Sequence, residues 1–161
     1  MSKSDQMLQG LAASSGMSSA IDFNEHGVAS FDVDGKLTLC FQKARENQAL
    51  QIYCAVGLVP VMNRESFYRK ALEANLFGAD TLGSVLAIDP EFNEVVLSQL
   101  VDPHLVSDQD FLNLLDDFIG VALGWREKLN VNRWELPQAP QIPEKTLAAP
   151  TDMAAHFMNR A

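Results

Sequence analysis

The stretch Leu72-Glu73-Ala74-Asn75-Leu76-Phe77-Gly78 decides how this chain folds. Apolar residues recur through it, and through the residues before it, at helical spacing, which predicts an amphipathic helix over residues 64–77. Gly78 fits the position just past the end of a helix, because glycine adopts the left-handed backbone conformation there without strain. No residue in the stretch suggests catalysis, so its role is expected to be in the structure or in binding.

Two strands and a long helix are expected downstream of this stretch. Residues 83–88 and 93–101 are rich in Val, Leu and Ile, and the dipeptide Asp89-Pro90 marks the turn between them. After Ser107, apolar residues keep a 3.6-residue period over about five turns, which is typical of a helix packed along one face. The members of this stripe are Phe111, Leu114, Leu115, Phe118, Ala122, Trp125 and Leu129.

Upstream, a short helix and three strands are expected. Residues 4–15 show a narrow apolar stripe, and residues 28–33, 37–44 and 49–56 alternate as strands do, with Asp34-Gly35 as the first hairpin turn. If a second hairpin is centred near Glu46, both faces of this sheet carry apolar side chains. The second face then needs a helix or a partner to cover it. One face then carries Cys40, Leu50, Ile52, Cys54 and Val56, and the other carries Leu37, Leu39, Phe41 and Tyr53.

Composition excludes several classes of function. The chain has 161 residues, enough for one domain with a core, and a formal charge of −9, which repels nucleic acid. Its apolar runs are too short to cross a membrane, and its N-terminus lacks a secretory signal, so we expect a cytoplasmic protein. The two cysteines are expected to be small buried residues, and the three histidines show no metal-ligand spacing.

The C-terminal part differs from the rest. Four prolines break residues 131–161, which predicts a flexible tail that is dispensable for folding after a domain of residues 1–130. Trp134, just after the long helix, is expected to pack back onto the domain, with an anchor for a neighbouring chain as the alternative.

The whole pattern resembles the class I type III secretion chaperones of the Tir-chaperone (CesT-like) family. The resemblance runs from about residue 4 to residue 130 and rests on Leu72–Gly78, on the two strands after it and on the closing helix. It implies an α+β fold in the order α-β-β-β-α-β-β-α with a twisted antiparallel sheet. It also implies a homodimer without a cofactor or a metal, whose partner is an effector protein.

The resemblance also assigns surfaces. In the family the second helix and an adjacent strand form much of the dimer interface, and the first helix with the sheet takes up an extended N-terminal effector segment. On this chain the dimer residues would be Phe67, Leu72, Leu76, Val85 and Ala87. The effector-binding residues would be Leu8, Leu11, Phe31, Leu39, Phe41 and Ile52.

A second class of function stays open at this point. A small α+β enzyme or small-molecule carrier would need a pocket between a helix and the sheet. No local Ser/His/Asp, Cys/His or Gly-rich phosphate pattern supports catalysis, so we expect no enzyme. A dimer that carries a polypeptide would favour the chaperone, and a monomer that carries a metabolite would favour the alternative.

Overall fold

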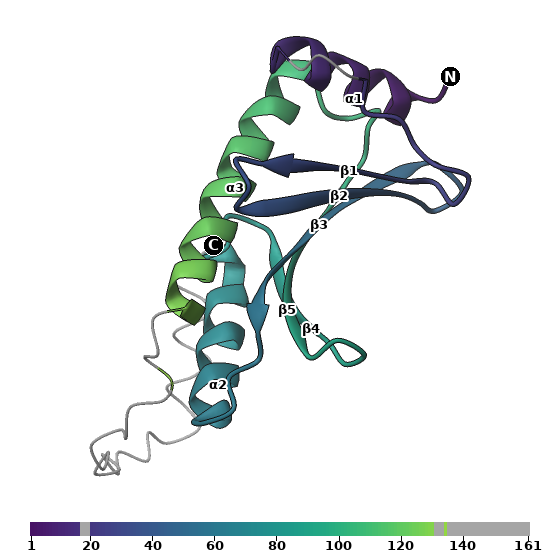
Figure 1. Cartoon of the computed structure of the whole chain (residues 1–161). Helices are drawn as coiled ribbons and strands as arrows, with labels where there is room; N and C mark the ends of the chain where they lie inside the picture. Colours follow the sequence, from purple (N-terminus) through teal and green to yellow (C-terminus); the bar gives the residue numbers. More distant parts are fainter. Residues whose placement is uncertain (17–19, 131–133, 135–161) are drawn as a thin grey trace, which may run out of the picture.

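The structure of the protein is a computed structural model that describes residues 1–16, 20–130 and 134. Helix α3 runs along the sheet, with α1 near its start and α2 near its end (Figure 1). The elements are α1 (Lys3–Ser14), β1 (Val28–Val33), β2 (Leu37–Ala44), β3 (Ala49–Leu58), α2 (Arg64–Asn75), the short 3-10 turn η1 (Leu76–Gly78), β4 (Val85–Asp89), β5 (Glu94–Val101) and α3 (Asp108–Asn130). The predicted order of helices and strands is confirmed.

The five strands form one antiparallel sheet in the order β1-β2-β3-β5-β4. Strands β1 and β4 are therefore the two edges, and β3 lies in the centre. A bulge between Ala55 and Gly57 bends β3 where α3 crosses it. The α+β fold with a twisted antiparallel sheet agrees with the expectation, whereas a single chain does not test the homodimer.

The face assignment of β2 and β3 was wrong. Phe41 pairs with Ile52 and Cys40 pairs with Tyr53, so Phe41 and Ile52 share one face. The connecting loop is centred between Glu46 and Asn47, half a residue from the expected centre, and this shift exchanges the two faces of one strand relative to the other. One face is therefore consistently apolar and buried, and the opposite face carries polar and small residues such as Thr38, Gln42 and Gln51.

The buried face of the sheet packs against α3 and α1. The expected stripe of α3 is confirmed at Phe111, Leu115, Phe118, Ala122 and Trp125, which are all buried. Helix α1 adds Met7, Leu8 and Leu11 to the same core. This core is large enough to hold one domain together without disulfides or metals.

A partly buried ion pair joins the start of α1 to the sheet. Ser2 and Asp5 form a reciprocal capping box. The Asp5 carboxylate also forms an ion pair with the Lys43 ammonium of β2, with the two groups 2.8 Å apart. The Lys43 ammonium lies 4.4 Å from the centre of the Phe23 ring. Hydrogen bonds from Lys43 and Ser2 lower the pKa of Asp5 to about 2.

The Asp5 carboxylate should make stability depend on pH. Because its pKa is lowered in the folded protein, its contribution is full above about pH 4 and is lost as the pH falls toward 2. We expect Asp5→Asn to lower the free energy of unfolding by about 1 kcal/mol at pH 7, a value reduced for its partial exposure, and by much less near pH 2. Urea unfolding at both pH values measures this, with Asp116→Asn on the exposed side of α3 as the control. An equal loss at both pH values would contradict the assignment.

Two further expectations from the sequence concern the C-terminal tail and the absence of a membrane-crossing helix. Apart from Trp134, the predicted flexible tail of residues 131–161 lies outside the described residues. Within the described part of the chain, no helix is both long and apolar enough to cross a membrane.

Candidate functional site

One stretch of the chain exposes an unusual amount of apolar surface. Large apolar side chains that are normally buried lie open to solvent on α2, η1, the loop that follows and β4, and Leu72 and Phe77 are 70% and 82% exposed. Contiguous apolar surface of this kind marks protein contacts in natural proteins. The exposed members are Tyr68, Leu72, Leu76, Phe77, Leu82, Val85 and Ile88, and we call them the α2–β4 patch.

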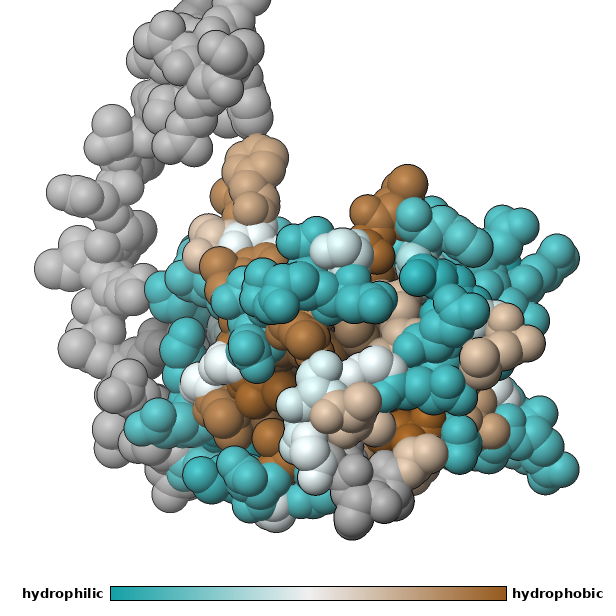
Figure 2. All heavy atoms as spheres, turned by 90° about the horizontal axis from the view of Figure 1, so that it is seen from above, coloured by the Kyte–Doolittle hydropathy of each residue, from teal (hydrophilic) through white to brown (hydrophobic). Residues whose placement is uncertain are grey.

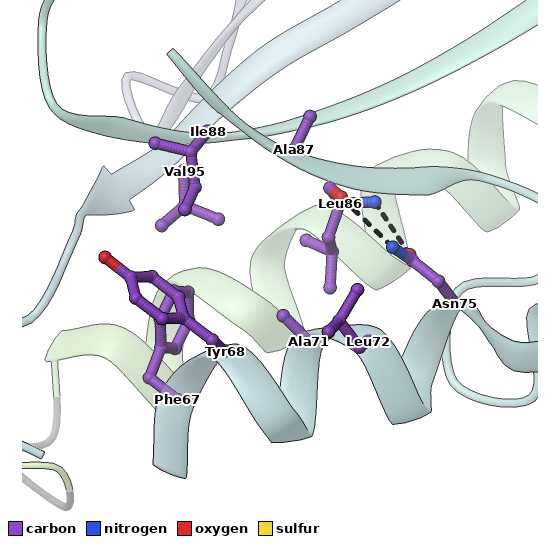
Figure 3. Close-up of a pocket in the computed structure, with 9 residues that line it drawn as sticks. All are labelled: Phe67, Tyr68, Ala71, Leu72, Asn75, Leu86, Ala87, Ile88 and Val95. Carbon is purple, nitrogen blue, oxygen red and sulfur yellow. Dashed lines mark hydrogen bonds between the residues drawn. The ribbon is translucent and has the colours of Figure 1, made fainter. Parts of the chain in front are cut away.

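The centre of this patch is hollowed into a groove. A pocket of about 290 Å³ lies between α2 and the strand pair β4–β5, and almost all of its walls are apolar (Figure 3). Helix α2 supplies one wall and β4 with β5 supplies the other. The lining residues are Phe67, Tyr68, Ala71, Leu72, Asn75, Leu86, Ala87, Ile88 and Val95.

Asn75 holds the two walls of the groove together. Its side-chain amide donates to the Leu86 carbonyl over 3.1 Å, and its side-chain oxygen accepts from the Leu86 N–H over 2.8 Å (Figure 3). The amide thus bonds the outward backbone groups of an edge strand as a neighbouring strand would. Sequence reasoning counted Asn75 as part of an apolar stripe and missed this role, although a lone amide in the last turn of an apolar face was a usable signal.

Replacing Asn75 should test this clamp. Asn75→Ala leaves the N–H and C=O of Leu86 without their partner, so we expect a loss of about 1–3 kcal/mol in the free energy of unfolding. Asn113→Ala, on the exposed side of α3, is the matched control and should cost far less. Chemical denaturation measures both, and equal effects would show that the clamp contributes nothing.

The expected helix over residues 64–77 is shorter in the structure, since α2 ends at Asn75 and Gly78 instead closes η1. Two features require a glycine at position 78. Its φ of 68° is left-handed, and a Cβ at this position would lie only 2.7 Å from the backbone nitrogen of Gly83. The chain therefore turns tightly between η1 and β4, which brings β4 alongside α2.

The residues assigned to a dimer interface are exposed in this region with one exception. Leu72 and Ala87 line the groove, and Leu76 and Val85 are exposed beside the lining residues Asn75 and Leu86 in the chain. Phe67 lines the groove but is 1% exposed, so it belongs to the core beneath the patch. The sequence placed Tyr68 on the same helix stripe but not at the interface. It missed Ile88 and Val95, because only the pairing of β4 with β5 brings these two residues together opposite α2.

The residues assigned to effector binding are mostly inside the domain. Leu8, Leu11, Leu39, Phe41 and Ile52 are buried in the core, because α1 and α3 cover the apolar face of the sheet. They are therefore not a surface that a partner reaches in this structure. Phe31 differs, since it lies half-buried on the edge strand β1 and stacks on Phe41 with ring centres 5.8 Å apart.

Strand β1 is one edge of the sheet, and its outward backbone groups can be identified. The N–H and C=O of Val28 both bond to Asn24, so they point away from β2, and alternation points those of Ser30 and Asp32 the same way. The other edge, β4, is already clamped by Asn75 at Leu86. Seen from the α1 end, the surface shows apolar patches between hydrophilic side chains (Figure 2).

The chemistry of the site favours contact over catalysis. In the groove, the polar groups are the Tyr68 hydroxyl and the Asn75 amide, and the amide is already bonded to Leu86. Cys40 and Cys54 lie on opposite faces of the sheet, and burial raises the pKa of Cys54 to about 12, so this thiol is a poor nucleophile. Among the described residues, no three His, Cys, Asp or Glu side chains gather as metal ligands.

Comparison with known proteins gives a family match. The sequence profile of the Tir chaperone protein (CesT) family matches residues 6–126, which is most of the chain. A protein of Chlamydia pneumoniae that carries only gene designations is 20% identical over 129 residues, which are 80% of this chain and 98% of that protein.

Solved structures share the fold. The ExsC–ExsE complex contains a chain with a TM-score of 0.69 at 19% identity, covering 80% of this chain and 97% of the other. The HopA1–SchA chaperone–effector complex gives 0.65 at 17% identity, covering 78% and 94%. The Yersinia pestis type III secretion chaperone SycH, in complex with a fragment of YscM2, gives 0.61 at 18% identity, covering 75% and 98%.

Proposed function

We propose, because this chain belongs to the Tir chaperone protein (CesT) family, that it is a type III secretion chaperone of the bacterial cytosol. It binds an extended N-terminal segment of an effector protein and keeps that protein soluble and competent for export. The family match carries this proposal, and the open α2–β4 patch with its apolar groove supports a protein that works by contact.

The α2–β4 patch is where we place a second copy of the chain. Its exposed side chains are too large and too apolar to remain in water at no cost, since each contributes roughly 1.5–3 kcal/mol when it is fully buried. A twofold dimer brings the same patch of both copies together, so that side chains such as Leu72 of each chain fill the groove of the other.

The free edge at β1 is where we place the effector segment. An extended chain adds to a sheet edge through its backbone and gains specificity from alternate side chains. Ser30 and Asp32 offer outward backbone groups there, and Phe31 with Val33 offers half-buried apolar surface. Of the six residues expected to bind effector, Phe31 is the one that keeps this role.

Phe31→Glu tests the placement of the effector. We expect it to weaken binding of an N-terminal fragment of the effector that co-purifies with the protein by 10-fold or more, because a charge would face the apolar side chains of the bound strand. Gln42→Glu, exposed on the opposite face of the neighbouring strand β2, adds the same charge and should change binding by less than about twofold. Titration calorimetry measures both. Equal affinities for both variants would move the effector elsewhere.

The enzymatic or small-molecule alternative needs the same α2–β4 groove. That groove offers a candidate metabolite one hydroxyl and no charged side chain. We therefore expect no turnover, and native mass spectrometry should find a polypeptide bound to the protein. A monomer with a bound metabolite would favour the alternative.

A further inference from the structure

Trp134 lies beyond the last helix but packs on the start of α2. Its ring meets the ring of Phe67 edge to face, with centres 5.4 Å apart and planes at 84°. The side-chain amide of Asn63 donates a hydrogen bond to the Trp134 carbonyl. The ring also closes one side of a second pocket, of about 310 Å³, beside Leu58, Val61 and Leu129. This arrangement joins Trp134 to α2.

The contact reaches the α2–β4 groove through a single residue. Phe67 is 1% exposed and lines the groove. The centre of its ring lies 5.7 Å from the centre of the Tyr68 ring, and Tyr68 lines the same groove. Trp134 is not among the residues that line this groove, so it supports the groove from behind. Removal of Trp134 would leave Phe67 without its packing partner on that side.

The first turn of α2 depends on the same contact. Asn63 stands at the N-cap of α2 with a left-handed φ of 52° and forms no side-chain capping bond to the helix. An asparagine at this position usually caps the helix with its side chain, whereas here the amide bonds to the backbone of Trp134. The backbone of Trp134 is therefore bonded to the residue at the start of α2.

We propose that Trp134 is a positioning residue for dimerisation: it holds Phe67 and the start of α2 in the arrangement that the second copy recognises. The inference rests on the proposed dimer through the α2–β4 patch. It gives a role to a residue that lies beyond residues 6–126, the part matched by the family. Any partner that draws Trp134 away from Phe67 would weaken the dimer.

The test is the dimer dissociation constant of full-length variants, measured by sedimentation. Trp134→Ala should weaken the dimer 10-fold or more, and Trp134→Phe, which keeps an aromatic edge on Phe67, should stay within about threefold of the wild type. Truncation after Pro137 keeps Trp134 and should leave the constant unchanged, whereas truncation after Asn130 should act like Trp134→Ala. If Trp134→Ala does not fold, Trp134→Leu replaces it and should be weaker than Trp134→Phe.

The outcomes separate this inference from the proposed function. Leu72→Asp places a charge in the groove and tests the dimer surface itself. If Leu72→Asp dissociates the dimer and the Trp134 variants do not, the positioning role is wrong and the proposed interface stands. If neither change affects the dimer, the interface lies elsewhere and both proposals fail.

Discussion

Phe41→Ala should destabilise the domain by about 3–5 kcal/mol, a large part of the roughly 5–15 kcal/mol that holds a domain of this size together. Phe41 is fully buried on β2 and stacks on Phe31, so its loss leaves a cavity that α1 and α3 cannot fill by small shifts. Urea unfolding monitored by circular dichroism measures the change.

The neighbouring residue provides a matched control. Gln42 follows Phe41 on β2 and is exposed on the opposite face, so Gln42→Ala should change the free energy of unfolding by no more than about 0.5 kcal/mol. A Phe41→Ala variant of nearly wild-type stability would mean that this face of the sheet is not the covered one.

The second large effect is expected at the α2–β4 patch. Leu72 is 70% exposed in the single chain, so Leu72→Asp should hardly affect the stability of the monomer. In the dimer the carboxylate would be buried against the groove of the second copy, and we expect the dissociation constant to rise roughly 100-fold, which corresponds to about 3 kcal/mol.

Lys70→Gln is the control for charge in this experiment. Lys70 is exposed on α2, pairs with Glu73 on the helix surface and does not line the groove, and its change alters the net charge by the same −1. Its surface ion pair contributes little, so the dimer should remain. A Leu72→Asp protein that sediments as the wild-type dimer would remove the patch from the interface.

The order of the elements could be predicted from sequence because each one carries its own local signal. These signals are local and need no tertiary information. They are the 3.6-residue period of α3, the Asp34-Gly35 turn and the glycine that follows the second helix. The strands from Val28 to Ala44 were placed to the residue for this reason.

The faces of the sheet were harder to predict because they depend on register. The loop between β2 and β3 contains Arg45, Glu46 and Asn47, all with positive φ, and nothing in these residue types fixes its centre to half a residue. That small error mixed the side chains of the two faces, so the covered face could not be recognised, and Leu39, Phe41 and Ile52 stayed among the expected effector contacts although they are core residues.

The walls of the groove illustrate a second limit. Leu72 and Leu76 were found as part of an apolar helix face, but periodicity alone cannot say whether such a face meets the core, a partner or solvent. Asn75 and Trp134 act through partners 11 and 71 residues away in the chain, Leu86 and Asn63, which no local pattern reveals.

The central claim is that this protein holds an extended segment of another protein. Amide hydrogen exchange on an N-terminal fragment of the effector that co-purifies with the protein, free and bound to the full-length protein, tests it most directly. We expect fast exchange throughout the free fragment and, in the complex, slow exchange over a continuous segment that pairs with β1. A fragment that is already protected before binding would be a folded domain, and that result would contradict the account.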